Sequence, residues 1–272
     1  MREKHKGKEK VMKFKSIITC VMAVIAVASC SESKATAGET ITVDSVKYEK
    51  NDKAVEVSII ADYPTLASAN LKTAISEYIS EQLGGTYMGS LENGDSIVAF
   101  YGKAKHDSLL KEHEECGIPA AFCSMSSVRK AYETENYITY TTEDYEYLGG
   151  AHGSTTLSGI TFRKTDGRRF GYEMLRNRES DTFHALLRDG VKEYFGEQGM
   201  NGNLKDVLMG VDNVDYMPLP VTEPYLTDKG MMFVYQQYEI APYAAGMPSF
   251  VIPFEKIKPY LTATVLKMIN RQ

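Results

Sequence analysis

The apolar positions in the first half of the folded chain change from a strand spacing to a helix spacing. Val55, Val57 and Ile59 alternate with polar residues, which is typical of a half-buried strand. After Pro64 the apolar residues recur every three or four positions, and two consecutive glycines end this run after Leu83. We therefore expect two strands within residues 41–63, a helix over residues 65–83 and a less regular second helix over residues 95–115.

The second half of the chain shows a similar mixture of strand and helix patterns. A segment rich in Tyr and Thr centres on residues 137–141 and favours a sheet. Asp166-Gly167 is a strong two-residue turn signal, and it lies between two apolar runs that should pair as a hairpin. We expect strands within residues 126–147, 156–162, 225–239 and 249–252, and helices over residues 183–195 and 254–261.

These patterns predict an α+β fold. The expected elements divide into two small α/β units, each a mainly antiparallel sheet packed by helices. A glycine-rich stretch at residues 149–153 separates the two units, so we expect an N-terminal domain over residues 41–150 and a C-terminal domain over residues 151–272.

The first thirty residues have the features of an export signal. A Lys-rich segment beginning at Met12 leads into apolar residues 17–28, which are too few to span a bilayer as a stable helix. Cys30 follows small residues, and this arrangement resembles a bacterial lipobox, in which the cysteine is acylated. The alternative is an ordinary secretory signal followed by an incidental cysteine. We expect a lipoprotein signal peptide over residues 1–29, a lipid on Cys30 and a flexible tether over residues 30–40.

Charge is distributed unevenly between this signal and the rest of the chain. The whole sequence has a formal net charge of −5, whereas residues 1–29 carry seven Lys or Arg and two Asp or Glu. The mature part therefore has a net charge of about −10. Such an acidic protein is not expected to bind nucleic acid, and it suits a basic partner better. We expect it in the cell envelope, attached to a bacterial membrane outside the cytoplasm through its lipid.

Two cysteines remain in the expected domains. Cys116 and Cys123 are an even pair in an exported protein, which favours a disulfide between them. The alternatives are two free thiols, or a zinc site that also uses His113. The sequence contains no phosphate-binding loop, dinucleotide fingerprint or nucleophile elbow, so we expect neither a cofactor nor a bound metal.

Two patches of the sequence resemble a pair of domains found in exported bacterial proteins. The first is residues 149–153 together with the hairpin that ends in Thr165-Asp166-Gly167-Arg168. The second is residues 235–248, which read YQQYEIAPYAAGMP, followed by Val251-Ile252-Pro253-Phe254. They resemble the PdaC-like N-terminal domain and the RsiV-like C-terminal domain, and the resemblance covers most of residues 41–262.

The resemblance has consequences for function. This domain pair occurs in the lysozyme-binding ectodomain of RsiV-type anti-sigma factors, and it precedes the catalytic domain of PdaC-type peptidoglycan deacetylases. It therefore implies a lysozyme-like protein partner or a contact with peptidoglycan. This chain differs from both examples, because its sequence shows neither the transmembrane helix and sigma-binding segment of the first nor the deacetylase domain of the second.

The candidate binding residues lie in the same two patches. His152 lies between small residues in a loop, where its ring could meet a ligand, and Gly150 permits close approach of the backbone. Glu239 could act as a general base or anchor a basic partner, while Tyr238 and Tyr243 could offer an aromatic contact surface. Each has a structural alternative, in which His152 stabilises a tight turn, Glu239 caps backbone amides and the tyrosines belong to the core.

The leading hypothesis is therefore a lipid-anchored cell-envelope binding protein without catalytic activity. Its partner would be a lysozyme-like hydrolase or a cell-wall component. One alternative is a cell-wall or glycan hydrolase related to deacetylases, which would use His152 and Glu239. Another is a purely structural accessory lipoprotein. No catalytic residue is assigned, because nothing in the sequence supplies a coupled nucleophile and base.

Overall fold

The structure is a computed structural model that describes residues 40–200 and 202–269. These residues belong to one compact unit, in which two sheets and their helices enclose two hydrophobic cores. The predicted α+β fold, with helices packed on two mainly antiparallel sheets, is confirmed. The expected signal peptide, Cys30 and most of the expected tether lie outside the described residues.

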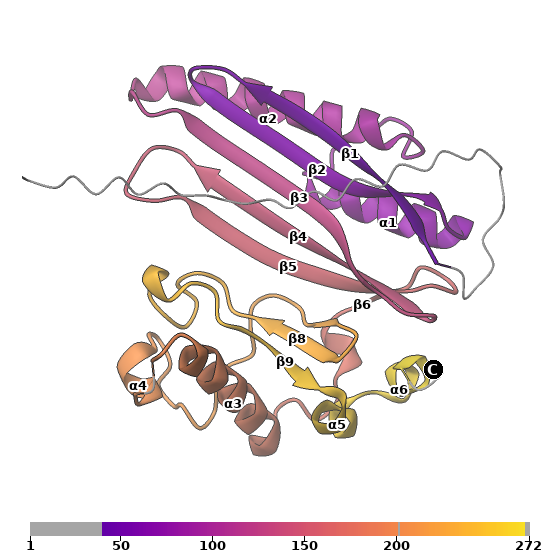
Figure 1. The fold of residues 1–272 in the computed structure, drawn as a ribbon, viewed down its shortest axis with the longest axis vertical. Coiled ribbons are helices and arrows are strands. Elements are labelled where there is room, and N and C mark those ends of the chain that lie inside the picture. The colour runs from indigo at the N-terminus through magenta and orange to yellow at the C-terminus, as the bar shows by residue number, and fades with distance from the viewer. Residues whose placement is uncertain (1–39, 201, 270–272) are drawn as a thin grey trace, which may run out of the picture. The chain divides into compact units, whose positions relative to one another are not determined.

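Six strands form the larger sheet, in the order β1-β2-β3-β4-β5-β6 (Figure 1). Strands β2 and β3 pair in parallel, whereas all other neighbours are antiparallel. Parallel neighbours require a crossover, and the long segment between β2 and β3 supplies it. The strands are β1 (Thr42–Asn51), β2 (Val55–Leu66), β3 (Phe122–Glu133), β4 (Tyr137–Tyr147), β5 (Ser154–Arg163) and β6 (Arg169–Phe170).

The crossover contains two helices, α1 (Ala69–Gln82) and α2 (Gly94–Cys116), which lie along the same face of the large sheet (Figure 1). The Asn93 side chain caps the start of α2 by accepting a hydrogen bond from the Ser96 amide at 2.8 Å. Gly117, with φ of 62°, ends the helix in the left-handed conformation that glycine adopts without strain. Among the described residues, no helix is long and apolar enough to cross a membrane.

Three short strands form the smaller sheet, in the order β7-β8-β9. Helix α3 packs on β9, and its buried residues Phe183, Leu187 and Val191 follow the predicted spacing. The strands are β7 (Tyr225–Leu226), β8 (Gly230–Val234) and β9 (Ser249–Pro253). The helices are α3 (Asp181–Glu197), α4 (Leu204–Val207), α5 (Phe254–Ile257) and α6 (Ala263–Ile269), and single turns of 3-10 helix are η1 (Tyr172–Met174), η2 (Tyr243–Ala245) and η3 (Lys258–Tyr260).

The smaller sheet docks on the large sheet through β4 and β5. The hydroxyl of Tyr137 donates to the Thr227 carbonyl at 2.8 Å, and that of Thr139 donates to the Leu226 carbonyl at 2.7 Å. Alternate residues of a strand point to opposite faces, and Ile138 belongs to the core beneath α1 and α2 whereas Tyr137 belongs to the other core. The C-terminal elements therefore pack against β4 and β5 on the face opposite α1 and α2.

Two boundaries differ from the sequence prediction. Strand β5 pairs with β4 over its whole length, so the large sheet continues past the boundary expected after residue 150 and ends at Phe170. The strand expected to reach residue 239 ends at Val234, because the chain turns there and Tyr238 adopts a positive φ of 65°. Residues 235–248 are therefore mostly loop, which is the segment that contains the candidate site.

Candidate functional site

His152 and two tyrosines from the 235–248 loop form an aromatic cluster. The imidazole of His152 stacks on the ring of Tyr243, with ring centres 3.7 Å apart and an angle of 19° between the planes. The Tyr238 hydroxyl lies 3.1 Å from His152 Nε2, and the Tyr238 and Tyr243 rings are 5.8 Å apart. Three of the residues expected to bind are thus brought together, although 86 positions separate His152 from Tyr238.

Local backbone geometry fixes this cluster. His152 Nδ1 lies 2.9 Å from the Gly153 carbonyl oxygen, which leaves Nε2 for the Tyr238 hydroxyl. A Cβ at Gly153 would lie 2.4 Å from the Tyr145 ring, so any other residue there would displace that ring. The positive φ of Tyr238 is unusual for a residue with a side chain and turns its ring outwards, where 58% of the residue is exposed.

The cluster continues onto the large sheet. Tyr145 lies beside Gly153, and its cross-strand partner Met125 is 40% exposed. Burial raises the pKa of Tyr145, and the neighbouring Cys123 and Tyr243 raise it further. We call this set the aromatic surface; it consists of Met125, Tyr145, His152, Tyr238 and Tyr243.

Glu239, the fourth candidate side chain, binds backbone amides. One carboxylate oxygen accepts the Gln236 amide at 2.7 Å, and the other accepts the Val221 amide, also at 2.7 Å. Partial burial raises the pKa of Glu239, and the two amides act in the opposite direction. The alternative in which Glu239 caps backbone amides therefore describes its contacts, and among the described residues neither of these hydrogen bonds joins it to His152.

Gly150 lies in the turn before His152 and is exposed. Its amide and its carbonyl both contact the Tyr147 hydroxyl, at 3.3 and 3.2 Å. Nothing lies within 4 Å of the position that a Cβ would occupy, so the structure does not require glycine there. A binding role for Gly150 therefore stays a prediction, and among the described residues its hydrogen bonds are with Tyr147 and not with His152, Tyr238 or Tyr243.

Gln236 and Gln237 have a role that the sequence analysis missed. Gln236 Oε1 accepts the Leu157 amide at 3.0 Å, and Gln236 Nε2 donates to the Leu157 carbonyl at 2.7 Å. Gln237 Oε1 accepts the Thr155 amide at 2.9 Å. These side chains replace a neighbouring strand along the free edge of β5 and hold the 235–248 loop against the large sheet. The repeated glutamines were the available signal, but their partners lie about 80 positions away.

The expected disulfide is absent from the structure, in which Cys116 and Cys123 are free thiols. Cys116 is the last residue of α2, which lies on one face of the large sheet. Phe122 belongs to the core on that face, so the next residue, Cys123, points to the opposite face. The sheet itself therefore separates the two sulfur atoms.

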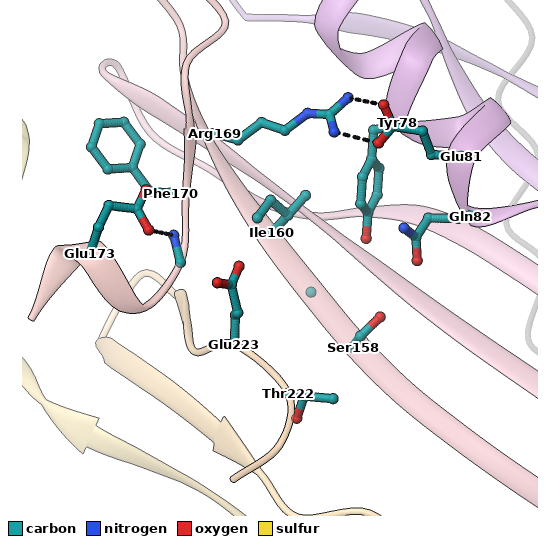
Figure 2. Close-up of a pocket in the computed structure, with 12 residues that line it drawn as sticks. Tyr78, Glu81, Gln82, Ser158, Ile160, Arg169, Phe170, Glu173, Thr222 and Glu223 are labelled. Atoms are coloured by element: carbon teal, nitrogen blue, oxygen red, sulfur yellow. Dashed lines mark hydrogen bonds and ion pairs between the residues drawn. The ribbon is translucent and has the colours of Figure 1, made fainter. Parts of the chain in front are cut away.

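Two hollows lie beside the C-terminal end of α1. The first, of about 350 Å³, is lined by side chains from α1, β5, β6 and the Thr222-Glu223 segment (Figure 2). Arg169 forms a two-point ion pair with Glu81 at its margin. The second, of about 380 Å³, lies between α1, α2 and the large sheet and shares Glu81 and Gln82 with the first. Within residues 40–200 and 202–269, no group of three or more His, Cys, Asp or Glu side chains could hold a metal ion.

Two family models match separate parts of the chain. Residues 48–155 match the model described as deacetylase PdaC, and residues 213–255 match the model described as DUF3298, a protein of unknown function. This order of domains agrees with the one that the sequence resemblance implied. A comparison with curated proteins found no match.

Two solved structures have a similar fold. A member of the DUF3298 family from Bacteroides fragilis NCTC 9343 superposes with a TM-score of 0.68 at 17% identity, covering 87% of this chain and 100% of that one. A DUF3298 family protein from Pseudomonas aeruginosa PAO1 gives a TM-score of 0.61 at 14% identity, covering 85% and 98%. At these identities the likeness shows the fold alone.

Proposed function

We propose that this chain is a cell-envelope binding protein without catalytic activity, which contacts a protein partner through the aromatic surface. The observation that carries the proposal is the stack of His152 on Tyr243 beneath an exposed Tyr238. Tyrosine offers a large contact area at a low cost in conformational entropy, and an arrangement already fixed before binding reduces that cost further.

The charge of the chain indicates the kind of partner. The mature part is acidic, with a net charge of about −10, so it would attract a basic protein and accelerate the encounter. The domain composition, a PdaC match followed by a DUF3298 match, favours a partner of the cell envelope. We propose a lysozyme-like hydrolase as this partner.

A hydrolase function receives less support from the same geometry. It would need a carboxylate that can exchange a proton with His152 or with substrate. The two oxygens of Glu239 instead accept the amides of Gln236 and Val221. We therefore assign no catalytic role to His152 or Glu239.

Binding of a lysozyme to the full chain tests the proposal. We expect a complex whose association rate falls as the salt concentration rises, because an encounter between an acidic and a basic protein is screened. The dissociation rate should change much less with salt, because it depends mainly on the buried aromatic contacts. Absence of any complex at low salt would contradict the proposed partner.

We also propose a lipid on Cys30, which lies outside the described residues. Replacing Cys30 with serine should release the protein from membranes and abolish labelling by a radioactive fatty acid, because serine supplies no thiol for acylation. Fractionation of cells that express each form checks this expectation. If the Cys30→Ser protein stays in the membrane fraction, the lipoprotein interpretation is wrong.

A further inference from the structure

The large sheet presents polar side chains to its helices in one region. Towards one end of this face, Val128, Ile138 and Phe162 are fully buried in the core. Towards the other end, the cross-strand neighbours on β3, β4 and β5 are all polar. They form two rows, Ser126 beside Asp144 beside Thr156, and Ser124 beside Glu146 beside Ser154.

The burial of this polar region decreases from β3 to β5. Ser124 is buried and Ser126, Asp144 and Glu146 are partly buried, whereas Ser154 and Thr156 at the edge are exposed. Polar groups that are buried or partly buried cost stability unless they make hydrogen bonds. The region forms the floor of the 380 Å³ hollow, and the C-terminal end of α1 and the middle of α2 form its walls. Gly84, with φ of 135°, follows α1 at this wall. A Cβ at this position would lie 3.2 Å from the Tyr101 ring, so the backbone approaches the ring closely.

The hollow has room and access for a small ligand. Its volume lies within the range of ligand pockets, roughly 300–1,000 Å³. It adjoins the 350 Å³ hollow through Glu81 and Gln82, which line both. Figure 2 shows this border, with Gln82 from α1 and Ser158 from β5 on facing sides. We call the two hollows together the polar cleft.

The polar cleft carries excess negative charge. Lys105 Nζ lies 3.1 Å from a Glu146 oxygen, and Glu81 is paired with Arg169, so these charges are compensated. Asp144 forms no ion pair within 4.0 Å among the described residues. Burial raises the pKa of Asp144, because it penalises the charged carboxylate, although the nearby Ser126 hydroxyl and Lys105 ammonium both lower this pKa. A ligand that donates hydrogen bonds to Asp144 would relieve this cost.

We propose that the polar cleft binds a saccharide that bears no acidic group. Sugar hydroxyls both donate and accept hydrogen bonds, as do the hydroxyls of Ser124, Ser126 and Thr156 on the floor. The carboxylate of Asp144 can accept from two hydroxyls, or from the ammonium group of an amino sugar. Tyr101 closes the wall of the hollow, but its ring is buried in the core, so the polar floor supplies the recognition.

Other ligand classes fit this chemistry less well. A phosphate or a uronic acid would bring a second negative charge beside Asp144 and Glu146, which costs free energy in a partly buried site. An apolar ligand would leave the floor hydroxyls and the Asp144 carboxylate without partners. Tyr145 of the aromatic surface also borders the 380 Å³ hollow. The side chains of Asp144 and Tyr145 are consecutive on β4 and point to opposite faces of the sheet, so the polar floor and the aromatic cluster lie on different faces.

Titration of the full chain with trisaccharides tests this inference by calorimetry and by NMR. The probes are β-1,4-linked glucosamine, its N-acetylated form and galacturonic acid. We expect saturable binding of the first two, with chemical-shift changes in β3, β4 and β5, and at least about tenfold weaker binding of the acidic probe. Saturable binding of neither of the first two probes, or equal binding of all three, would overturn the proposal.

Variants on two faces of one strand supply the controls. Asp144→Asn should weaken binding of the glucosamine probe about tenfold, because a charged acceptor is lost. Glu143→Gln removes a neighbouring exposed carboxylate that points to the opposite face, and it should leave the affinity unchanged. Equal effects of Asp144→Asn and Glu143→Gln on affinity would contradict the assignment of Asp144 to the binding site.

Two further variants complete the test. If Asp144→Asn lowers the thermal unfolding midpoint, Ser126→Ala tests the same floor and should also weaken binding. Tyr243→Ala should leave saccharide binding intact, which separates this site from the protein-contact proposal.

Discussion

Tyr243→Ala is expected to weaken binding of a lysozyme-like partner by about 1–3 kcal/mol while the protein still unfolds cooperatively. Tyr243 is only half-buried, and its ring supports the His152 ring by direct stacking. Removing it eliminates an aromatic contact and also leaves His152 and Tyr238 without their common neighbour. Partner affinity and thermal unfolding, measured on the same preparation, check this expectation.

Two other tyrosines provide matched controls. Tyr216 also stacks on a histidine, His184, with ring centres 3.5 Å apart, and is 42% exposed outside the aromatic surface. Tyr216→Ala should therefore leave partner affinity unchanged. Tyr235 is fully buried, so Tyr235→Ala should lower the free energy of unfolding by about 3–5 kcal/mol. If Tyr243→Ala resembles Tyr235→Ala, with a large loss of stability and no separate binding defect, the contact-surface hypothesis is wrong.

Gln236→Glu is expected to lower the free energy of unfolding by about 1–3 kcal/mol. The Gln236 amide both accepts from and donates to the backbone of Leu157, whereas a carboxylate can only accept. The Leu157 carbonyl would lose its donor and would face a negative charge instead. Denaturant unfolding of the two proteins measures the difference.

Gln237→Glu is the matched control for this change. The Gln237 side chain only accepts a hydrogen bond, from the Thr155 amide, and a glutamate can make the same bond. We expect little change in stability, although the added charge is the same as in Gln236→Glu. Equal destabilisation by the two substitutions would show that charge, and not the lost donor, is responsible.

The sequence predicted most of the individual elements because their signals are local. The alternation around Val57 and the helix spacing before Leu83 each depend on side chains that face one core. The Asp166-Gly167 turn likewise joins β5 to β6. The short helices α4 and α6 were missed, because four to seven residues contain too little periodicity to recognise.

The site could be predicted only in part, because its contacts join distant segments. The glycine-rich patch and the Tyr-rich segment contain the residues that the structure brings together, namely His152, Tyr238 and Tyr243. The direction of the Glu239 side chain was not predictable, because it depends on the amide of Val221 in another loop. The sequence also gave no sign that Ser126 and Asp144 are cross-strand neighbours, since register follows from pairing and not from residue type.

The single parallel pair in the large sheet imposes an order on folding. The β1–β2 hairpin and the β3–β6 meander each connect strands that follow one another in the chain, so both can form early. The junction of β2 with β3 must instead enclose a loop that includes α1 and α2, and closing a long loop costs entropy before any contact repays it. The β2–β3 pairing therefore depends on the docking of α1 and α2, and the rate of that docking should determine when the sheet becomes complete.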